Sequence, residues 1–222
     1  MAKRQKIKSI WYFSVKRVID VISSLILLVI FSPVILVVVI AIKMDSEGPI
    51  LADTPRRVGK DNKFFYPYKF RSMIVNAYYL LKTDPKFKEA YEEQQKGGNY
   101  KIKNDPRITK VGKFIRKYSL DEIPQLANVL KGEMSLVGPR PYYPEELEKQ
   151  QNIYPQTKRL VKEVLSVKPG ITGLWQVSGR SELKFDKRIS MDADYAHRKS
   201  IFLDLWIILK SPWAMISGKG AS

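Results

Sequence analysis

Residues 21–42 read VISSLILLVIFSPVILVVVIAI, an apolar segment without a formal charge. A straight helix of this length would be about 33 Å long, enough to cross a hydrocarbon core of about 30 Å. A cleaved signal peptide would need a shorter apolar core with a small-residue cleavage site, and this segment runs on into Lys43-Met44-Asp45. A buried helix of a soluble domain is the other alternative, but few domains hide so long an apolar run. The segment therefore predicts insertion into a membrane.

Ser32-Pro33 lies near the middle of this segment. Proline removes a helical hydrogen bond, and serine can satisfy the freed carbonyl. Two forms stay open: a kinked spanning helix, and a helix–break–helix hairpin that dips into the membrane and returns. Both flanks are basic, with Lys3, Arg4, Lys6, Lys8, Lys16 and Arg17 before the segment and Lys43, Arg56, Arg57 and Lys60 after it. The positive-inside rule therefore favours the re-entrant hairpin, with both ends on the cytoplasmic side.

Lys16, Arg17 and Asp20 stand where the chain would pass the headgroups. Lys16 and Asp20 are four residues apart, so on a helix they can pair as Asp20 enters the apolar zone. The sequence divides into an N-terminal basic segment with the re-entrant membrane helix, 1–45, and a cytosolic domain, 46–222, that lies on the membrane.

The remaining chain predicts an α/β domain that is mostly helical. Segments 50–58 and 63–71 flank a turn at 59–62 and form a small β-hairpin. Helices are expected at 72–96, ending at Gly97-Gly98, and at 107–118, 120–131 and 201–216, with loops at 136–144 and 166–181. Helix 107–118 is amphipathic and basic, which suits either a bilayer surface or a solvated face over an ordinary core stripe. Segment 201–216, with Trp206 and Trp213, lies either on the bilayer or in the core.

Composition narrows the chemistry. The 222 residues contain no cysteine and one histidine, His197, which excludes a disulfide framework and disfavours a catalytic triad or a zinc site. With 39 Lys+Arg against 22 Asp+Glu, the formal net charge of +17 indicates an anionic partner. Neither GxxxxGK[ST] nor GxGxxG occurs in the sequence, so a nucleotide would be held without a P-loop or a Rossmann turn.

Adjacent carboxylates stand in SLDEIPQL, 119–126, at Asp121 and Glu122. A capping box from Ser119 to Glu122 is one interpretation, but Pro124 fits better if Asp121 is the helix N-cap. A carboxylate at that end of a helix stays ionised, and an ionised aspartate is a competent nucleophile toward phosphorus. A plain helix cap remains the alternative on spacing alone.

Arginine and proline surround this pair in the sequence. Arg140 lies between Pro139 and Pro141, which fix the backbone, and a guanidinium matches phosphate geometry. Further candidate phosphate contacts are Lys69, Arg71, Arg107 and Arg116. Any one of them alone could be a surface cation, so the prediction rests on their grouping.

The chain resembles the bacterial sugar transferases, monotopic polyprenyl-phosphate glycosyl-1-phosphate transferases, in their minimal catalytic form. The resemblance covers nearly the whole chain, through Lys16-Arg17-x-x-Asp20, KFRSM at 69–73, NDPRITKVGKFIRKYSLDEIPQL at 104–126, NVLKGEMSLVGPRP at 128–141 and KPGITGLWQVSGRS at 168–181. The segment Ala52-Asp53-Thr54-Pro55 departs from the pattern, because relatives often carry aromatic or Gln residues there.

This resemblance implies transfer of a sugar 1-phosphate from a UDP-sugar, glucose or galactose first, to undecaprenyl phosphate, with release of UMP, at the start of exopolysaccharide, capsule or surface-glycan assembly. It implies that Asp121 forms a covalent phosphosugar intermediate, that Glu122 assists the acceptor phosphate and that Mg²⁺ is required, with Asp121 as a ligand. Lys69, Arg71, Arg116 and Arg140 would surround the phosphates, and Ser32-Pro33 would be the re-entrant break. The expected location is the cytoplasmic face of the bacterial inner membrane.

The alternative function is a membrane-anchored basic protein that binds anionic lipid or nucleic acid, which the charge alone would favour. It gives no reason for the adjacent carboxylates or for Pro-Arg-Pro, so we expect no nucleic-acid partner. A glycosidase is a weaker alternative, because adjacent residues rarely place two carboxyls across a sugar ring.

Overall fold

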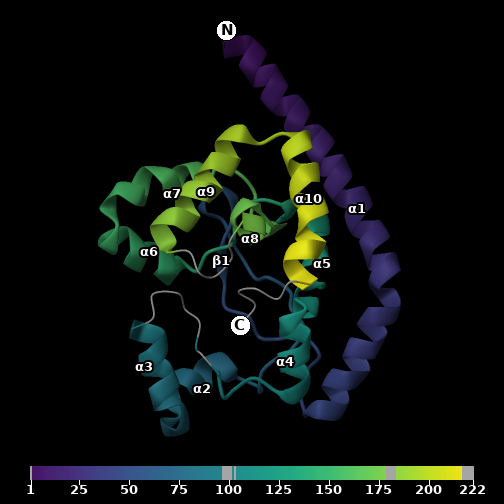
Figure 1. The fold of residues 1–222 in the computed structure, drawn as a ribbon, viewed down its shortest axis with the longest axis vertical. Coiled ribbons are helices and arrows are strands. Elements are labelled where there is room, and N and C mark those ends of the chain that lie inside the picture. Colours follow the sequence, from purple (N-terminus) through teal and green to yellow (C-terminus); the bar gives the residue numbers. More distant parts are fainter. Residues whose placement is uncertain (1, 97–101, 103, 179–183, 217–222) are drawn as a thin grey trace.

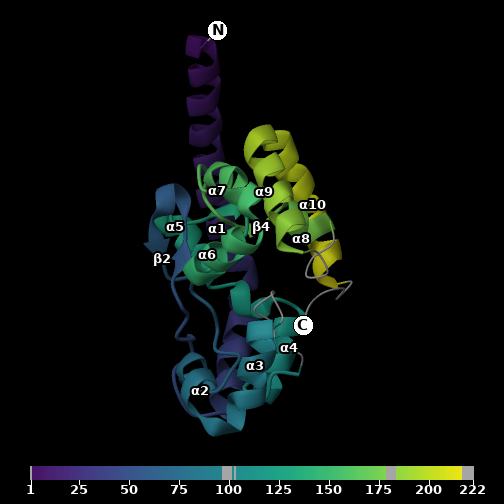
Figure 2. The same cartoon turned by 90° about the vertical axis from the view of Figure 1, so that its left-hand side faces the viewer.

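The structure is a computed structural model that describes residues 2–96, 102, 104–178 and 184–216. It is mostly helical, with two small sheets. The helix end predicted at Gly97-Gly98 and the last residues of the 168–181 block lie outside the described residues. Figures 1 and 2 show α1 along one side of the molecule, with α2 and α3 set apart from the group formed by α6, α7 and α9.

The elements follow one another along the chain with short connections. The α-helices are α1 Ala2–Asp45, α2 Ala77–Thr83, α3 Lys88–Lys96, α4 Lys110–Lys117, α5 Gln125–Lys131, α6 Pro144–Ile153, α7 Lys158–Val164, α8 Leu174–Ser178, α9 Phe185–Arg198 and α10 Ile201–Ile216. The 3₁₀ turns are η1 Lys60–Asn62, η2 Pro85–Phe87, η3 Leu120–Glu122 and η4 Pro155–Thr157, and the strands are β1 Arg57–Val58, β2 Phe64–Phe65, β3 Ser135–Val137 and β4 Gly170–Thr172.

The predicted β-hairpin is confirmed. Strands β1 and β2 pair antiparallel, with Val58 opposite Phe64, and a further bridge joins Leu51 to Phe70. The second sheet was missed, since β3 and β4 fall in the segments expected to be loops. These two strands pair in parallel, but each has three residues and is embedded in Gly- and Pro-rich sequence, too short to show a periodicity.

Two glycines explain that composition. A Cβ on Gly170 would stand 2.1 Å from the backbone nitrogen of Gly138, and one on Gly138 would stand 2.4 Å from the carbonyl oxygen of Lys168. Only glycine lets these two backbones approach so closely. The glycines therefore fix the exit of β3, which leads directly into Pro139-Arg140-Pro141.

Two of the predicted helices are interrupted. The region 72–96 divides into α2 and α3 at Asp84-Pro85, where the Asp84 carboxylate accepts a hydrogen bond from the Lys86 backbone and starts η2. The region 120–131 divides into η3 and α5. Proline inside each predicted helix ends the run of backbone hydrogen bonds.

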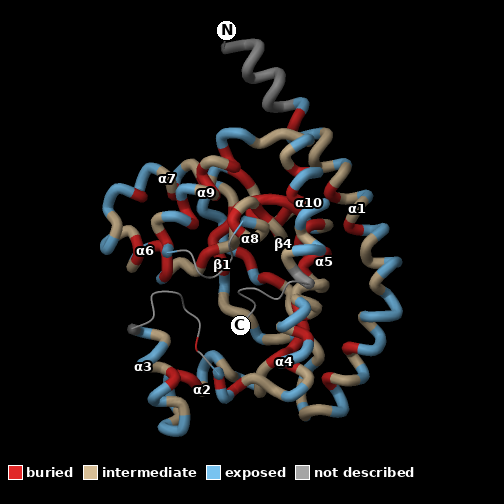
Figure 3. The backbone as a smooth tube through the Cα atoms, viewed as in Figure 1, coloured by how far each residue is buried: buried red, intermediate tan, exposed pale blue. Residues whose placement is uncertain are grey.

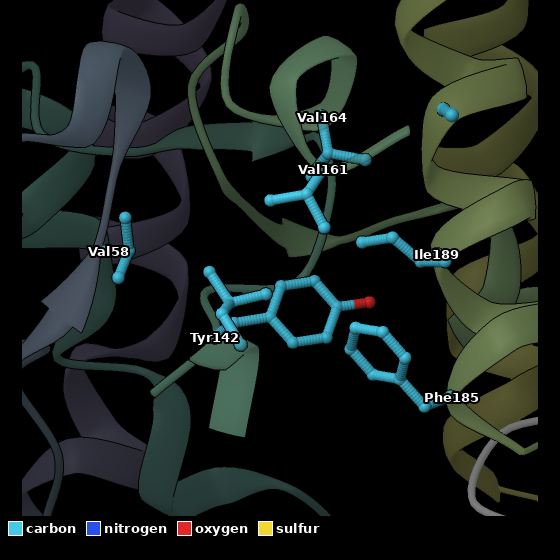
Figure 4. Packing of buried hydrophobic residues seen from close by; sticks show 8 residues of the cluster. Val58, Tyr142, Val161, Val164, Phe185 and Ile189 are labelled. Atoms are coloured by element: carbon cyan, nitrogen blue, oxygen red, sulfur yellow. The ribbon is translucent and has the colours of Figure 1, made fainter. Parts of the chain in front are cut away.

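The core lies where β1, α6, α7 and α9 meet. Figure 4 shows Tyr142 between Val58 on one side and Phe185 and Ile189 on the other. Tyr142 and Ile189 are fully buried, and the ring of Phe185 packs edge-on against Tyr142. A second cluster joins β3, α5 and α10, and its partly buried members include Leu27 and Leu28 of α1.

Helix α1 is one continuous helix that passes through Ser32-Pro33. The helix changes direction along its length, as Figure 1 shows. The helix–break–helix hairpin is therefore not confirmed. Pro33 has no N–H for the carbonyl of Val29, and the Ser32 hydroxyl donates to that same oxygen at 2.8 Å. The side-chain bond offsets the missing backbone bond, so the helix bends instead of ending.

Charged side chains bind the N-terminal half of α1 to the rest of the molecule. Arg17 donates to the carbonyl oxygens of Val129 and Leu130 at the end of α5, at 2.5 and 2.8 Å. The Asp20 carboxylate accepts from the Leu136 backbone of β3 at 3.1 Å.

The expected pairing of Lys16 with Asp20 is wrong. Lys16 instead lies 2.7 Å from Asp204 of α10, which also accepts hydrogen bonds from Tyr12 and Tyr195. Asp20 is buried against β3, and α10 is far away in the sequence, so helical spacing alone could not show which carboxylate Lys16 meets.

The C-terminal half of α1 is bound to the same body. Val38 and Ile42 pack with Phe70 and Ile115, and the Asp45 carboxylate accepts from the backbone of Val111 at the start of α4. The two ends of the apolar segment therefore contact one globular unit. Helix α1 ends at Asp45, although the division into 1–45 and 46–222 stays a prediction.

Much of α1 is exposed, as the pale-blue stretches of Figure 3 show, and its exposed residues are largely apolar. Over Trp11–Asp45 the helix is apolar enough to cross a membrane by length and composition. Its exposed large apolar residues are Trp11, Phe13, Val18, Ile22, Leu25, Ile26, Val29, Ile30, Val34, Leu36, Val37, Ile40 and Met44.

We predict that Arg17→Met destabilises the fold by about 2–4 kcal/mol, because it leaves two partly buried carbonyls without their charged donor. Thermal unfolding in detergent, followed by tryptophan fluorescence, measures the effect. Arg198→Met is the control, since its ion pair with Asp194 is largely exposed and should contribute under about 1 kcal/mol. Equal melting temperatures for the two variants would contradict the role of Arg17.

Candidate active site

Asp121 lies in η3, the turn between α4 and α5. Ser119 before it has φ 55°, a left-handed conformation that reverses the chain after α4. The expected N-cap role of Asp121 is wrong: α5 begins at Gln125 with Pro124 in the cap position, and neither Ser119 nor Pro124 makes a side-chain capping bond. Asp121 is 7% exposed, and it lines the cavity described below.

Lys69 joins the two carboxylates. Its ammonium lies 2.6 Å from Oε1 of Glu122 and 3.8 Å from Oδ2 of Asp121. Lys69 is placed by the hairpin, whose backbone is hydrogen-bonded on one side to Ala52 and on the other, through Phe70, to the carbonyl of Asp121 itself. The strand and the turn therefore hold the ammonium and both carboxylates in fixed positions.

The two carboxylates differ in acidity. Burial raises the pKa of Asp121, and Glu122 beside it adds to the rise, whereas Lys69 opposes it. Burial also acts to raise the pKa of Glu122, but the Lys69 ammonium, through charge and hydrogen bond, outweighs it and the net pKa lies below the usual value. Glu122 is thus the more acidic carboxylate of the pair, and Asp121 is the more basic one and the better oxygen nucleophile.

Arg140 lies in the loop after β3 and lines the same cavity as the two carboxylates. The loop that carries it is held by bonds from Gly138 to the Thr172 carbonyl, and from Gly170 to the Pro139 carbonyl, at 2.9 and 2.8 Å. Its guanidinium lies 5.7 Å from the ring centre of Trp175, and its charge helps to lower the pKa of Glu122. Arg116 of α4 acts in the same direction on the pKa of Asp121. Lys69, Arg116 and Arg140, which the sequence analysis grouped with the acidic pair, thus lie around it in the structure.

Arg71 and Arg107 have other partners. The Arg71 guanidinium donates to Pro49 and to the hydroxyl and carbonyl of Ser46, at 2.6, 2.5 and 2.8 Å, and so holds the chain that leaves α1. Arg107 donates to the Asp105 carboxylate and to the Ala77 carbonyl. Both line the cavity described below, but most of their hydrogen-bonding capacity is spent within the protein.

One cavity of about 1770 Å³ contains this site. Its polar part is formed by Asp121, Glu122 and the surrounding cations. Its apolar part is formed by side chains of α1 and α10, namely Ile26, Leu27, Phe31, Ile208 and Pro212. The cavity therefore joins a strongly charged region to the apolar segment that was predicted to enter a membrane.

Comparison with known proteins decides the family. The bacterial sugar transferase family matches residues 11–218. The chain belongs to this family.

Named relatives give the family context. The chain is 42% identical over 210 residues to the undecaprenyl-phosphate galactose phosphotransferase of Salmonella typhimurium, covering 93% of this chain and 41% of that protein. It is 40% identical over 214 residues to the UDP-glucose:undecaprenyl-phosphate glucose-1-phosphate transferase of Klebsiella pneumoniae, covering 93% and 41%. The exopolysaccharide production protein ExoY of Rhizobium meliloti is 37% identical over 207 residues, covering 93% and 87%. The chain thus spans about two fifths of the first two relatives and most of the third.

Sequence reasoning missed a buried polar network behind Arg140 in this family member. Asp192 of α9 accepts from the Tyr142 hydroxyl at 2.8 Å and from the Arg140 backbone at 3.4 Å. Arg188 lies one turn before it, 3.5 Å from the fully buried Glu146. The available signal was that Arg188 and Asp192 fall on the buried stripe of α9, where an apolar residue is expected.

Asp192 makes the stability of this sugar transferase depend on pH. Burial raises its pKa from an ordinary 3.8 to about 7, while the Tyr142 hydrogen bond opposes the rise. The folded state therefore holds a proton that the unfolded state releases between about pH 4 and 7. The associated stability is complete below pH 4 and is lost as pH rises through 7.

We predict that Asp192→Asn flattens the fall in stability between about pH 4 and pH 7, since asparagine accepts the same hydrogen bonds without ionising. The contribution removed is on the order of 4 kcal/mol. Melting temperature against pH measures it, with Asp194→Asn on the exposed side of the same helix as the control. A slope shared by the parent and both variants would rule out Asp192 as the titrating group.

Proposed function

We propose that this chain transfers a sugar 1-phosphate from a UDP-sugar to undecaprenyl phosphate and releases UMP, which would start exopolysaccharide, capsule or surface-glycan assembly. The observation that carries the proposal is the single cavity in which buried carboxylates and cations adjoin the apolar walls of α1 and α10. The donor carries a diphosphate, which needs the charged region of the cavity. The acceptor joins a phosphate to an apolar chain, so it needs both the charged region and the apolar walls. The relatives' names include both galactose and glucose, so both donors are retained.

The first step is attack by an Asp121 oxygen on the phosphorus that carries the sugar. The phosphorus–oxygen bond to the second phosphate breaks, UMP leaves with that oxygen, and an aspartyl phosphosugar forms. The raised pKa of Asp121 supports this role because a more basic carboxylate is a better nucleophile once ionised. The Lys69 ammonium, 3.8 Å from Asp121 Oδ2, favours the ionised carboxylate. At this distance it makes no short hydrogen bond that would occupy the attacking oxygen.

The second step is attack by an oxygen of undecaprenyl phosphate on the same phosphorus. The bond to Asp121 breaks, the carboxylate is restored, and a polyprenyl diphosphate sugar forms. Glu122, which accepts a hydrogen bond from Lys69, would receive any proton that the acceptor phosphate still carries. Arg116 and Arg140 supply positive charge where phosphate oxygens gather negative charge.

Mg²⁺ is part of the proposal. No cluster of three acidic or histidine side chains occurs in the part of the chain that the structure describes. Magnesium suits such a site, because it is commonly held by one or two carboxylates together with substrate phosphates and water. Asp121 is the residue that would hold it, and when bound the ion would neutralise diphosphate charge.

The membrane position follows from the way α1 is bound. Arg17 and Asp20 at one end, and Asp45 at the other, contact the same globular body. A helix that crossed a bilayer would place these ends on opposite sides. We therefore propose a monotopic arrangement in the inner leaflet of the bacterial inner membrane, with Ser32-Pro33 at the deepest point and the catalytic domain on the cytoplasmic face. Exposed Phe202, Leu209 and Trp213 of α10 would lie in the same interface.

We predict that Asp121→Asn lowers UMP release from UDP-glucose or UDP-galactose by at least about 1000-fold, since the amide is a poor nucleophile. Intact-protein mass spectrometry should detect a phosphosugar adduct on the parent and none on the variant. Asp61→Asn, in an exposed turn with φ 55° that asparagine tolerates, is the control. Turnover by Asp121→Asn at the parental rate would refute the nucleophile.

We predict that Gln5→Cys and Met44→Cys are both protected from a membrane-impermeant maleimide in sealed spheroplasts and react after lysis. The chain has no cysteine of its own, so each variant carries one thiol. Met44 is exposed, so its protection would come from the membrane and not from the fold. Labelling of only one of the two sites in intact spheroplasts would mean that α1 spans the bilayer.

A further inference from the structure

Two neighbouring arginines, Arg56 just before β1 and Arg57 at its start, have different surroundings. Arg56 is exposed, with its guanidinium 4.6 Å from the ring centre of Phe64. Arg57 is 9% exposed, with its guanidinium 3.1 Å from the ring centre of Tyr143. Arg57 also lines the cavity that holds Asp121, whereas Arg56 does not.

The charge of Arg57 is only partly matched within the protein, where the Tyr143 ring lies against its guanidinium and the charge of Glu146 favours its ionised form. Its Nε and Nη1 atoms are buried and have no hydrogen-bond partner, and no carboxylate forms an ion pair with it among the residues that the structure describes. A buried cation with unused N–H groups is costly unless an anion meets it. Burial accordingly lowers the pKa of Arg57, and the nearby positive charge of Arg140 lowers it further.

The backbone brings Arg57 and Arg140 to one place. The Val58 backbone N–H donates to the Tyr142 carbonyl at 3.0 Å, and the two residues form an antiparallel bridge. This pairing sets Arg57 beside Tyr143, which follows Arg140 by three residues in the chain. The guanidinium carbon lies over the Tyr143 ring, in a cation–π contact. Both arginines line the cavity that holds Asp121 and Glu122.

We propose that Arg57, positioned by Tyr143, binds phosphoryl oxygens of the substrate together with Arg140. This inference rests on the proposed function and assigns one more binding residue to its site. The two guanidiniums repel each other when the cavity is empty of anions, and a phosphate group between them removes that repulsion. The phosphate belongs either to the nucleotide donor or to the polyprenyl acceptor, and the experiment separates these two sources.

The donor is tested with uridine, UMP and UDP as probes, whose binding to the full chain in nanodiscs is measured by calorimetry. If Arg57 contacts the donor, Arg57→Gln should weaken UDP binding about 10-fold or more and leave uridine within about 2-fold, because a charged hydrogen bond is lost only where a phosphate is present. Arg57→Lys keeps the charge but not the planar fork and should fall between the parent and Arg57→Gln. Arg56→Gln removes the same charge one residue away and should leave all three affinities unchanged.

The acceptor is tested by the KM for undecaprenyl phosphate in the same variants. Unchanged UDP affinity with a KM raised about 10-fold in Arg57→Gln alone would assign the acceptor phosphate. The inference is overturned if UDP affinity and this KM are both parental in Arg57→Gln, or if uridine, UMP and UDP all weaken equally, which is the result of a purely structural role. Arg57→Lys serves in place of Arg57→Gln if the latter does not fold. A parent that binds UDP but releases no UMP would contradict the proposed function while leaving the UDP measurement valid.

Discussion

The attachment of α1 at both ends to one globular body is the constraint on which the rest of the structure depends. Arg17 and Asp20 satisfy backbone groups of α5 and β3 that would otherwise be left at element ends, and Asp45 does the same for α4. The apolar segment between them is therefore a wall of the protein, and its inward side chains help to form the cavity. Its outward side chains are exposed and apolar, and in the proposed arrangement they would contact lipid. The bend at Ser32-Pro33 lets a single helix follow the body over this length.

The cavity is built on an excess of positive charge around a small acidic centre. Lys69 is matched by Glu122, and Arg107 by Asp105, so each of these pairs is complete within the chain. Arg57 is not complete in this way, because its Nε and Nη1 atoms are buried without a hydrogen-bond partner and the positive charge of Arg140 lies nearby. Such a site is unfavourable without an anion and becomes favourable when one is bound. The net charge of the whole chain has the same sign as this local excess.

The sequence alone predicted the acidic pair, its basic neighbours and the apolar helix, because each is a local pattern with a direct chemical meaning. The partners of charged residues could not be read in the same way. Arg71 and Arg140 look alike in sequence, yet Arg71 binds Ser46 and Pro49 while the charge of Arg140 helps to lower the pKa of Glu122. The cap assignment for Asp121 failed because Pro124 is compatible both with a helix start at 122 and with the turn followed by a later helix that the chain adopts. The parallel pair β3–β4 depends on a close approach of two glycines far apart in the chain, which no local pattern records.

The apolar wall of the cavity has a kinetic consequence for the proposed reaction. A nucleotide reaches the carboxylates from a three-dimensional solution, whereas a polyprenyl carrier would arrive sideways, past α1 and α10, by diffusion within one leaflet. The relevant abundance of the carrier is then its number per unit area of membrane, and dilution of the cell suspension would not change it. Loss of the product into the leaflet follows the same lateral path in reverse. An enzyme of this shape would respond to how crowded and how fluid its membrane is, as much as to the amount of sugar nucleotide in the cytoplasm.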